Sequence, residues 1–360
     1  MRIGYQTLYL KKRFPLRISR GEMAGGENLF VWVSDGTYTG WGEMAPVASE
    51  GAASAGDGQA QLEAFVAQAG EQGLDGSIHD IWARGREAGV GACALAALDM
   101  ALWDLLAKQA GLPLCRLLGL ARRGVVSSVT LGINPPEVVR ERVPLLLAQG
   151  ARALKIKLGS PDGIEADRAM FAAVHEAVHE AVQKAQGGSG VALRVDANGG
   201  WSLDEARAMM TWLAERGVEY VEQPLARGAE DQLPDLFKDR ALPVFVDESC
   251  RFSNDIPGYA DCVDGVNLKL MKCGGITEAL RINATARAHG LQTMIGCMGE
   301  SSIAIAAGAS LAALFDHIDL DSHLNLDPDP AEGAPFADGV TLPADRPGHG
   351  GQLKKGHLDA

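Results

Sequence analysis

The chain lacks the features of a secreted, membrane-bound or nucleic-acid-binding protein. Its six cysteines are scattered over 360 residues without a Cys-x-x-Cys pair, which argues against a disulfide framework and a zinc site. No apolar run is long enough to span a membrane, and the N-terminal stretch MRIGYQTLYLKKRF has no secretory apolar core. A formal net charge of −13 disfavours nucleic acid and anionic membranes as partners. These absences predict a cytoplasmic protein with reduced thiols and a small-molecule partner.

The first third of the chain predicts an α+β unit. With 47% hydrophobic residues, the chain can build either two domains or one large α/β barrel with additions. The stretch LFVWVSDGTYTGWGE has an Asp35-Gly36 turn between two β-rich runs, which predicts a hairpin. The later stretch ACALAALDMALWDLLAKQAGLPL predicts a buried helix that stops at Gly111 and Pro113.

From about residue 126 onward, short β-rich runs recur with helical patterns between them. One helical pattern, SLDEARAMMTWLAERG, has Ser202 as its predicted N-cap and Gly217 as its stop. The eight β-rich runs are SSVTLGI (127–133), ALKIKL (153–158), VALRVDAN (191–198), VEYVEQP (218–224), PVFVDES (243–249), GVNLKLM (265–271), LQTMIG (291–296) and HIDLDS (317–322). This repetition predicts an α/β fold, a (β/α)7-8 TIM-type barrel over 126–324. We expect an N-terminal α+β capping domain over 1–125, completed by the C-terminal segment 325–360.

The stretch RALKIKLGSP carries two lysines inside an otherwise apolar strand. Because successive side chains of a strand alternate between its faces, Lys155 and Lys157 face the barrel interior while their apolar neighbours pack under the helices. The same parity directs further polar side chains of the barrel strands inward: Arg194, Asp196, Asn198, Asp247, Asn267, Lys269, Asp319 and Asp321. The charges lie at the C-terminal ends of their strands, where barrel enzymes place their chemistry.

Three carboxylates come from successive strands and converge. Asp196, Glu222 and Asp247 would repel one another in a small space unless a cation is present. Oxygen-only ligands that leave room for water or substrate favour one Mg²⁺ per subunit over zinc, with Mn²⁺ as a substitute. The alternative is a set of structural salt bridges to the neighbouring lysines.

Two of the interior lysines are placed to flank a bound molecule. Lys157 and Lys269 lie on strands about half a barrel apart. A partly desolvated lysine near a metal cation has a lowered pKa, so it can take up a proton near neutral pH. A divalent metal between two such lysines suits removal of a proton α to a carboxylate, because the cations stabilise the enediolate. If one lysine removes the proton and the other returns one to the opposite face, the reaction is racemisation or epimerisation.

Motifs along nearly the whole chain resemble the muconate-lactonizing enzyme subgroup of the enolase superfamily. The matching pieces are AALDMALWD, the K-x-K of KIKL, VDANGGW, EQP, DES and NLKLMKCGG. The resemblance implies that Lys157 and Lys269 are the acid/base pair and that Lys155 assists electrostatically. It also implies that the three converging carboxylates hold the metal.

Within this subgroup, dipeptide epimerases carry an Asp-x-Asp motif at the end of strand eight that binds the α-ammonium group of the substrate. Asp319-Leu-Asp321 stands at that place, and two acids without an obvious basic partner suit a cationic group. A solvated acidic turn is the alternative. The resemblance implies an isomerase, a Mg²⁺-dependent epimerase that converts L-Xaa-L-Xaa dipeptides, Ala-Glu-like or with other side chains, to L-Xaa-D-Xaa.

Several further residues are candidate substrate contacts. The stretch IGCMGES at the end of strand seven also resembles the epimerase pattern and contributes Cys297 and Met298, and Thr130 is a third candidate. In Ala–Glu epimerases an arginine on an N-terminal loop contacts the glutamate carboxylate. Arg20 in RFPLRISRGEMAGG is the candidate for that contact, although it does not fall in clean register. The sequence is compatible with a homo-oligomer.

Two other functions stay open at this point. An N-acylamino acid racemase or an o-succinylbenzoate synthase would share the lysines and metal ligands, but its substrate has no ammonium group for Asp319 and Asp321. Residues 175–179 form an H-E-x-x-H pattern, which on a helix can hold zinc with a glutamate as base. Here the pattern lies beside a stripe of valines on a helix of the outer barrel layer, so we expect a structural helix rather than a zinc protease.

Overall fold

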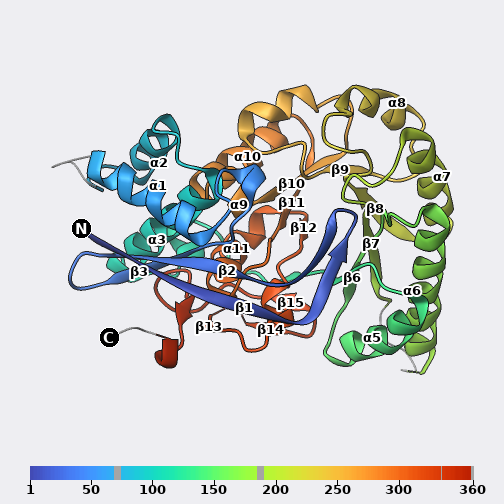
Figure 1. Cartoon of the computed structure of the whole chain (residues 1–360), viewed down its shortest axis with the longest axis horizontal. Coiled ribbons are helices and arrows are strands. Elements are labelled where there is room, and N and C mark those ends of the chain that lie inside the picture. The colour runs from blue at the N-terminus through green and yellow to red at the C-terminus, as the bar shows by residue number, and fades with distance from the viewer. Residues whose placement is uncertain (69–73, 185–189, 334, 358–360) are drawn as a thin grey trace.

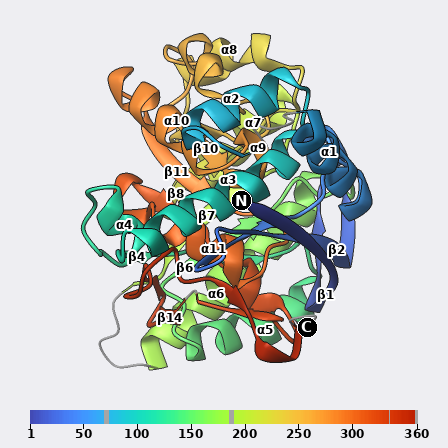
Figure 2. The same ribbon diagram turned by 90° about the vertical axis from the view of Figure 1, so that its left-hand side faces the viewer.

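The N-terminal part of the chain is an antiparallel sheet of order β1-β2-β3 with helices packed beside it, here called the cap (Figure 1). The computed structural model describes residues 1–68, 74–184, 190–333 and 335–357. The elements of the cap are β1 (Arg2–Ile18), β2 (Gly21–Ser34), β3 (Thr39–Met44), η1 (Ala48–Glu50), α1 (Ala55–Gln68), α2 (Ile78–Glu87), α3 (Ala92–Gln109) and α4 (Leu114–Leu117). Figure 2 shows α1 beside β2 and α3 from a second direction.

Two predictions for the cap are confirmed. The Asp35-Gly36 turn joins β2 to β3, because Asp35 Oδ1 accepts hydrogen bonds at 2.7 Å from two backbone N–H groups after the turn. The buried helix is α3. It packs against β3 so closely that a Cβ on Gly42 would lie 1.9 Å from the carbonyl oxygen of Ala97. The glycines in TGWGE are therefore required by the packing of α3 on the sheet.

The second part of the chain is a parallel eight-stranded barrel. Its sheet has the order β12-β11-β10-β9-β8-β7-β6-β5, and a parallel bridge between Ser127 and Ile318 closes it. The strands are β5 (Val129–Leu131), β6 (Ala153–Lys157), β7 (Ala192–Asp196), β8 (Val218–Glu222), β9 (Val244–Val246), β10 (Gly265–Lys269), β11 (Gln292–Gly296) and β12 (His317–Ile318). The helices are α5 (Pro136–Ala148), α6 (Ile164–Lys184), α7 (Leu203–Ala214), α8 (Leu233–Lys238), α9 (Leu270–Cys273), α10 (Ile276–Ala288) and α11 (Ser302–Ala309). The predicted TIM-type fold is confirmed.

The barrel differs from the prediction in its details. The strands are shorter than the β-rich runs, and β12 has only two residues, so Asp319 and Asp321 follow the strand rather than lying in it. Between β9 and β10 the chain forms the 3₁₀ helix η4 (Ser253–Gly258) instead of an α-helix, and Pro257 lies inside it. The predicted N-cap of α7 is confirmed, since Ser202 accepts from the N–H of Glu205 in a capping box.

Apolar and charged side chains occupy different levels of the barrel interior. A small apolar cluster of Tyr220, Phe245 and Met294 packs together at the middle of the strands. The charged residues lie above it, toward the C-terminal ends. Lys155 is fully buried in the barrel interior and contacts the carboxylates, as the strand parity predicts.

The cap is fixed to the barrel by buried carboxylates at helix N-termini. Glu43 of β3 accepts from the N–H and hydroxyl of Ser301, the N-cap of α11, at 2.8 and 2.6 Å. Asp99 of α3 accepts from the N–H of Thr277 in α10 at 3.0 Å. These hydrogen bonds connect the cap to the barrel, because each satisfies a buried carboxyl oxygen and an N–H group at a helix N-terminus.

The C-terminal segment runs back along the cap. The remaining short elements are β4 (Val125–Val126), η3 (Glu230–Gln232), η5 (Ala312–Leu314), η6 (Ser322–Asn325), β13 (Ala331–Glu332), β14 (Phe336–Ala337), β15 (Val340–Thr341), β16 (Gln352–Leu353) and η7 (Lys355–His357). The N–H of Asp327 donates to the carbonyl of Lys11 in β1, and His349 donates from its backbone to Asp104 of α3.

The proposed division at residues 125 and 324 stays a prediction. Within the described ranges, no helix is both long and apolar enough to cross a membrane.

Candidate active site

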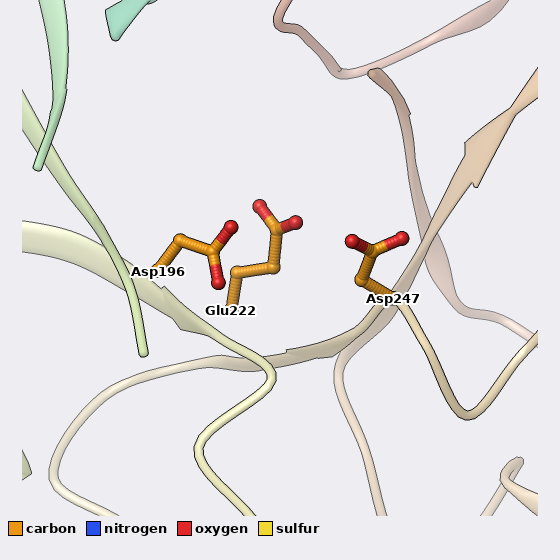
Figure 3. Close-up of side chains that lie close together, drawn as sticks. All are labelled: Asp196, Glu222 and Asp247. Atoms are coloured by element: carbon orange, nitrogen blue, oxygen red, sulfur yellow. The ribbon is translucent and has the colours of Figure 1, made fainter. Parts of the chain in front are cut away.

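Three carboxylates meet at the C-terminal ends of three neighbouring strands (Figure 3). Asp196 is the last residue of β7, Glu222 is the last of β8, and Asp247 follows β9 directly. One oxygen of each lies within 4.8 Å of the other two, and all three side chains are fully buried. In the part of the chain that the structure describes, this is the one group of His, Cys, Asp or Glu side chains close enough to hold a metal ion.

The three carboxylates fit a hard divalent cation. Burial, together with the neighbouring Asp196 carboxylate, raises the pKa of Glu222 to about 8. Its Oε2 atom accepts no hydrogen bond within the described residues, although Lys155 Nζ lies 2.7 Å from it in an ion contact. Oxygen ligands around Mg²⁺ are about 3 Å apart, so these groups need only a small approach to share one ion.

Polar side chains from the strand ends hold these carboxylates in place. Asn267 Nδ2 donates to Glu222 Oε1 at 2.8 Å, as the inward parity of Asn267 allows. Gln223 Oε1 accepts from the backbone N–H of Asp247, also at 2.8 Å. Gln223 belongs to the EQP motif, but its positioning role depends on the neighbouring strand and could not be derived from the motif.

The two lysines of the predicted acid/base pair approach the carboxylate cluster from opposite sides. Lys157 Nζ lies 2.5 Å from Asp196 Oδ2, and Lys269 Nζ lies 2.7 Å from Asp247 Oδ2. Burial lowers the pKa of Lys269, but the Asp247 carboxylate outweighs burial and raises that pKa above its ordinary value. Burial raises the pKa of Asp247, and the ammonium of Lys269 outweighs burial and leaves that pKa well below its ordinary value. The sequence predicts a lowered lysine pKa beside a bound metal cation. Next to the carboxylates alone, the pKa of Lys269 is raised instead.

Lys155 lies one layer deeper and links the carboxylate cluster to the end of β12. Its Nζ atom lies 2.7 Å from both Glu222 Oε2 and Asp319 Oδ2, and 3.3 Å from Asp196 Oδ2. Burial lowers the pKa of Lys155, but these carboxylates together hold it well above its ordinary value. Lys155 is thus a fixed positive charge in the barrel interior.

Asp319 and Asp321 present carboxylate oxygens that lack a strong partner. Asp319 Oδ1 is buried and has no hydrogen-bond partner among the described residues. Asp321 Oδ2 accepts from the N–H of Thr130 at 2.6 Å, whereas Asp321 Oδ1 has only the Cys297 thiol at 3.9 Å. Burial and the adjacent Asp319 carboxylate raise the pKa of Asp321 to about 6. The two acids are brought together beside Thr130 and Cys297, and among the described residues the one cationic group within ion-pair distance of either is Lys155.

The remaining predicted contacts lie on two sides of the barrel mouth. Arg20, at the turn between β1 and β2, donates to Glu248 Oε1 at 2.7 Å and to the carbonyl of Asn198 at 2.9 Å. Its guanidinium therefore connects the hairpin to the barrel loops, and its predicted substrate contact stays a prediction. Met298 lines a cavity of about 310 Å³ between the cap and the end of β11.

Two buried lysines near the site were not predicted from the sequence. Lys272 in α9 donates to the backbone carbonyls of Cys250 and Asn267 at 3.1 and 3.0 Å and also contacts the Asp247 carboxylate. It lies in the quoted motif NLKLMKCGG, but its direction depends on where β10 ends. Lys12 in β1 lines the same cavity as Met298. Nothing in the sequence around Lys12 indicates that β1 passes over the barrel.

The H-E-x-x-H pattern forms no metal site. His175, Glu176 and His179 are exposed on α6, on the outside of the barrel. Glu176 lies 3.5 Å from Arg140, and His179 contacts Gln183 at 2.7 Å. The structural interpretation of this helix is therefore confirmed.

Comparisons with known proteins agree with this geometry. Residues 5–119 match the mandelate racemase / muconate lactonizing enzyme N-terminal domain, and residues 138–356 match the enolase C-terminal domain-like family. The chain is 72% identical to a hydrophobic dipeptide epimerase of Roseobacter litoralis and 57% identical to one of a Flavobacteria bacterium, over 98–99% of this chain and 99% of each relative.

Solved structures lead to the same group. The dipeptide epimerase of Enterococcus faecalis V583, solved with Mg and the dipeptide L-Leu-L-Tyr, superimposes with a TM-score of 0.86 at 30% identity. The match covers 97% of this chain and 98% of that one. The chain belongs to the enolase superfamily and, within it, to the dipeptide epimerases of the mandelate racemase / muconate lactonizing enzyme group.

Proposed function

We propose that this chain epimerises hydrophobic L,L-dipeptides at the α-carbon of the C-terminal residue, with Mg²⁺ as its cofactor. The observation that carries the proposal is the pair of carboxylates Asp319 and Asp321. Asp319 Oδ1 has no hydrogen-bond partner among the described residues, and Asp321 Oδ1 has a weak contact with the Cys297 thiol at 3.9 Å. Both acids border a site that also contains two opposed lysines and three clustered acids. The relatives named as hydrophobic dipeptide epimerases support the choice of apolar side chains.

The proposed substrate orientation follows from the charges. The α-ammonium group of the dipeptide pairs with Asp319 Oδ1 and Asp321 Oδ1, because a buried carboxylate oxygen without a donor is costly. The substrate carboxylate points toward the opposite side of the mouth, where Asp196, Glu222 and Asp247 would hold Mg²⁺. When bound, the metal supplies positive charge that stabilises the negative charge developing on the substrate carboxylate. Mn²⁺ as a substitute remains part of the proposal.

The two lysines then act on opposite faces of the α-carbon. Lys157 Nζ accepts the α-proton as the C–H bond breaks, and Lys269 Nζ–H donates a proton as the new C–H bond forms on the other face. In the reverse direction the two lysines exchange roles. Lys155 remains protonated and contributes positive charge from below.

The direct test is hydrogen exchange at the α-carbon. The chain incubated with L-Leu-L-Tyr and Mg²⁺ in D₂O should incorporate deuterium at the tyrosine α-carbon and form the L-Leu-D-Tyr isomer, measured by NMR. If no member of a dipeptide library exchanges with Mg²⁺ present, the proposal is wrong. Replacing Mg²⁺ with Mn²⁺ in the same assay tests the second ion.

One substitution distinguishes dipeptide epimerisation from the alternative reactions, which are racemisation of N-acylamino acids and o-succinylbenzoate synthesis. Those substrates carry no ammonium group, so they would not use the free oxygens of Asp319 and Asp321. We expect Asp321→Asn to lower kcat/KM for the dipeptide by about 100-fold or more, as for loss of a buried charge pair. An N-succinylamino acid that reacts faster than any dipeptide, with no effect of Asp321→Asn, would support the alternative.

A further inference from the structure

The cavity between the cap and the barrel contains one buried ammonium group. Its walls are mostly apolar and include Met23, Val47, Met298 and Leu326. Lys12 of β1 lines this cavity and is only 7% exposed. The other charged residue on the lining is Glu27, which is exposed.

The Lys12 ammonium has no counter-ion in direct contact. Within the described residues, no carboxylate lies within salt-bridge distance of it, and no acceptor takes a hydrogen bond from its Nζ atom. The nearby amide of Asn28 is already used, since it donates to Glu43 and to the carbonyl of Gly299. A buried ammonium without a partner is costly, so its retention in this position calls for a role in the cavity.

Lys12 lies near the proposed binding site for the α-ammonium group of the dipeptide. Met298 and Gly299 of the cavity lining directly follow Cys297, whose thiol lies 3.9 Å from Asp321 Oδ1, so the cavity borders the predicted ammonium site. Lys12 Nζ also lies 3.5 Å from the point where a side chain on Gly299 would begin. If the substrate ammonium is held by Asp319 and Asp321, the side chain on the same residue of the dipeptide is the one that enters the cavity.

We propose that Lys12 is a specificity-determining residue that rejects dipeptides with a cationic side chain on the N-terminal residue. This inference rests on the proposed function. A second positive charge in the cavity would be repelled by the Lys12 ammonium, and the one carboxylate on the lining, that of Glu27, is exposed to solvent, where charge pairing contributes little. An apolar side chain of the same length meets only the apolar walls and the methylene stem of Lys12.

The test compares two dipeptides that differ in one ammonium group. L-norleucyl-L-leucine and L-lysyl-L-leucine have N-terminal side chains of the same length, and kcat/KM is measured for each by α-deuterium incorporation. We expect the protein to prefer the norleucyl dipeptide by about 30-fold or more, and Lys12→Met to reduce that preference by about tenfold. The readout is the ratio of the two kcat/KM values within each variant, so a general loss of activity in Lys12→Met does not affect it.

Two control variants exclude a general effect on folding or charge. Lys11→Met removes the exposed lysine next to Lys12 on the same strand and should leave the preference unchanged. Lys12→Arg keeps the charge and should retain the preference. Moving the charge to the other residue, in L-leucyl-L-lysine against L-leucyl-L-norleucine, should give a ratio that does not respond to Lys12→Met.

The outcomes separate the two proposals. If the norleucyl dipeptide exchanges but Lys12→Met leaves the preference unchanged, or if Lys11→Met changes it equally, the inference about Lys12 is overturned and the epimerase proposal stands. If no dipeptide exchanges with the unsubstituted protein, the proposed function fails and the inference fails with it.

Discussion

The two sides of the proposed site are built in opposite ways. The barrel wall consists of the lysines and carboxylates at the strand ends, and the cap wall consists of the cap residues that line the cavity around Lys12. The barrel wall is dense in charge, and its lysines pair with the three carboxylates of the predicted metal site at 2.5 to 3.3 Å. The cap wall is largely apolar and contributes one buried ammonium, that of Lys12, which no carboxylate contacts in the part of the chain that the structure describes. Two of the cap's other buried carboxyl groups, those of Glu43 and Asp99, lie at its junction with the barrel and do not line the cavity.

This difference separates reaction chemistry from substrate selection. Proton transfer needs groups held within a fraction of an ångström, and parallel strands whose ends are tied together provide that rigidity. Selection of a side chain needs a surface whose shape and charge can vary without disturbing the reacting groups. A hairpin that crosses the mouth of the barrel provides such a surface.

The largest effect should come from the barrel wall. We expect Lys157→Ala and Lys269→Ala each to lower the rate of dipeptide epimerisation by about 1,000-fold or more, since each removes the proton donor or acceptor on one face. Lys11→Ala, on the exposed side of β1, serves as the control and should keep full activity. Either lysine variant retaining a tenth of the original rate would contradict the assignment of that lysine.

Removal of one carboxylate should weaken metal binding by a smaller factor. Asp247→Asn leaves two negative ligands of the predicted three, so we expect Mg²⁺ affinity to fall by about 10- to 100-fold. Isothermal titration with Mg²⁺ alone measures this loss without reference to activity. The exposed Asp261→Asn should bind Mg²⁺ with unchanged affinity, and equal affinity in both variants would rule out Asp247 as a ligand.

The junction between cap and barrel should show a pH-dependent stability. Burial raises the pKa of Asp99 to about 7, even though Thr277 donates to its carboxylate. A carboxyl whose pKa is raised on folding stabilises the folded state most when it is protonated, so its contribution is lost as pH rises from about 4 to about 7. Relative to Asp99→Asn, the unfolding free energy of the unsubstituted chain should fall by about 2 to 4 kcal/mol across that range.

Urea unfolding at several pH values gives this difference directly. A constant difference between pH 4 and pH 7 would mean that Asp99 titrates alike in the folded and unfolded chain. Asp57→Asn, on the exposed side of α1, should give no pH-dependent difference.

The smallest effect should come from the hairpin tip. Arg20 is 54% exposed on its side chain and pairs with Glu248, and exposed ion pairs contribute little free energy. We expect Arg20→Ala to raise KM by about two- to fivefold with little change in kcat, because the hairpin is held over the mouth less firmly. A large loss of kcat would instead place Arg20 among the groups that contact the reacting part of the substrate.

The sequence predicts the barrel wall better than the cap wall, for a physical reason. Alternation along a strand fixes which side chains face inward, so Lys155, Lys157 and Asp196 could be placed from local pattern alone. Because the parallel strands of the barrel are neighbours in the order in which they occur in the chain, their C-terminal ends lie together. The polar residues that support them, such as Gln223 and Lys272, needed the three-dimensional neighbours, because each acts on a different strand.

The cap wall follows no such rule. Lys12 lies in a strand of 17 residues whose local pattern does not reveal what it covers. Its burial depends on β1 crossing the barrel mouth, a contact between segments more than 300 residues apart in the chain, as shown by the hydrogen bond from the N–H of Asp327 to the carbonyl of Lys11. Arg20 was recognised as a candidate, but its pairing with Glu248 depends on the same crossing.

The central claim is that two lysines act on opposite faces of one α-carbon, and isotope exchange in the single-lysine variants tests it most directly. In D₂O with Mg²⁺, Lys157→Ala and Lys269→Ala should each still exchange the α-proton of one diastereomer of Leu-Tyr, and the diastereomer that exchanges should differ between them. Exchange of the same diastereomer by both variants, or of both diastereomers by either one, would contradict the two-face account.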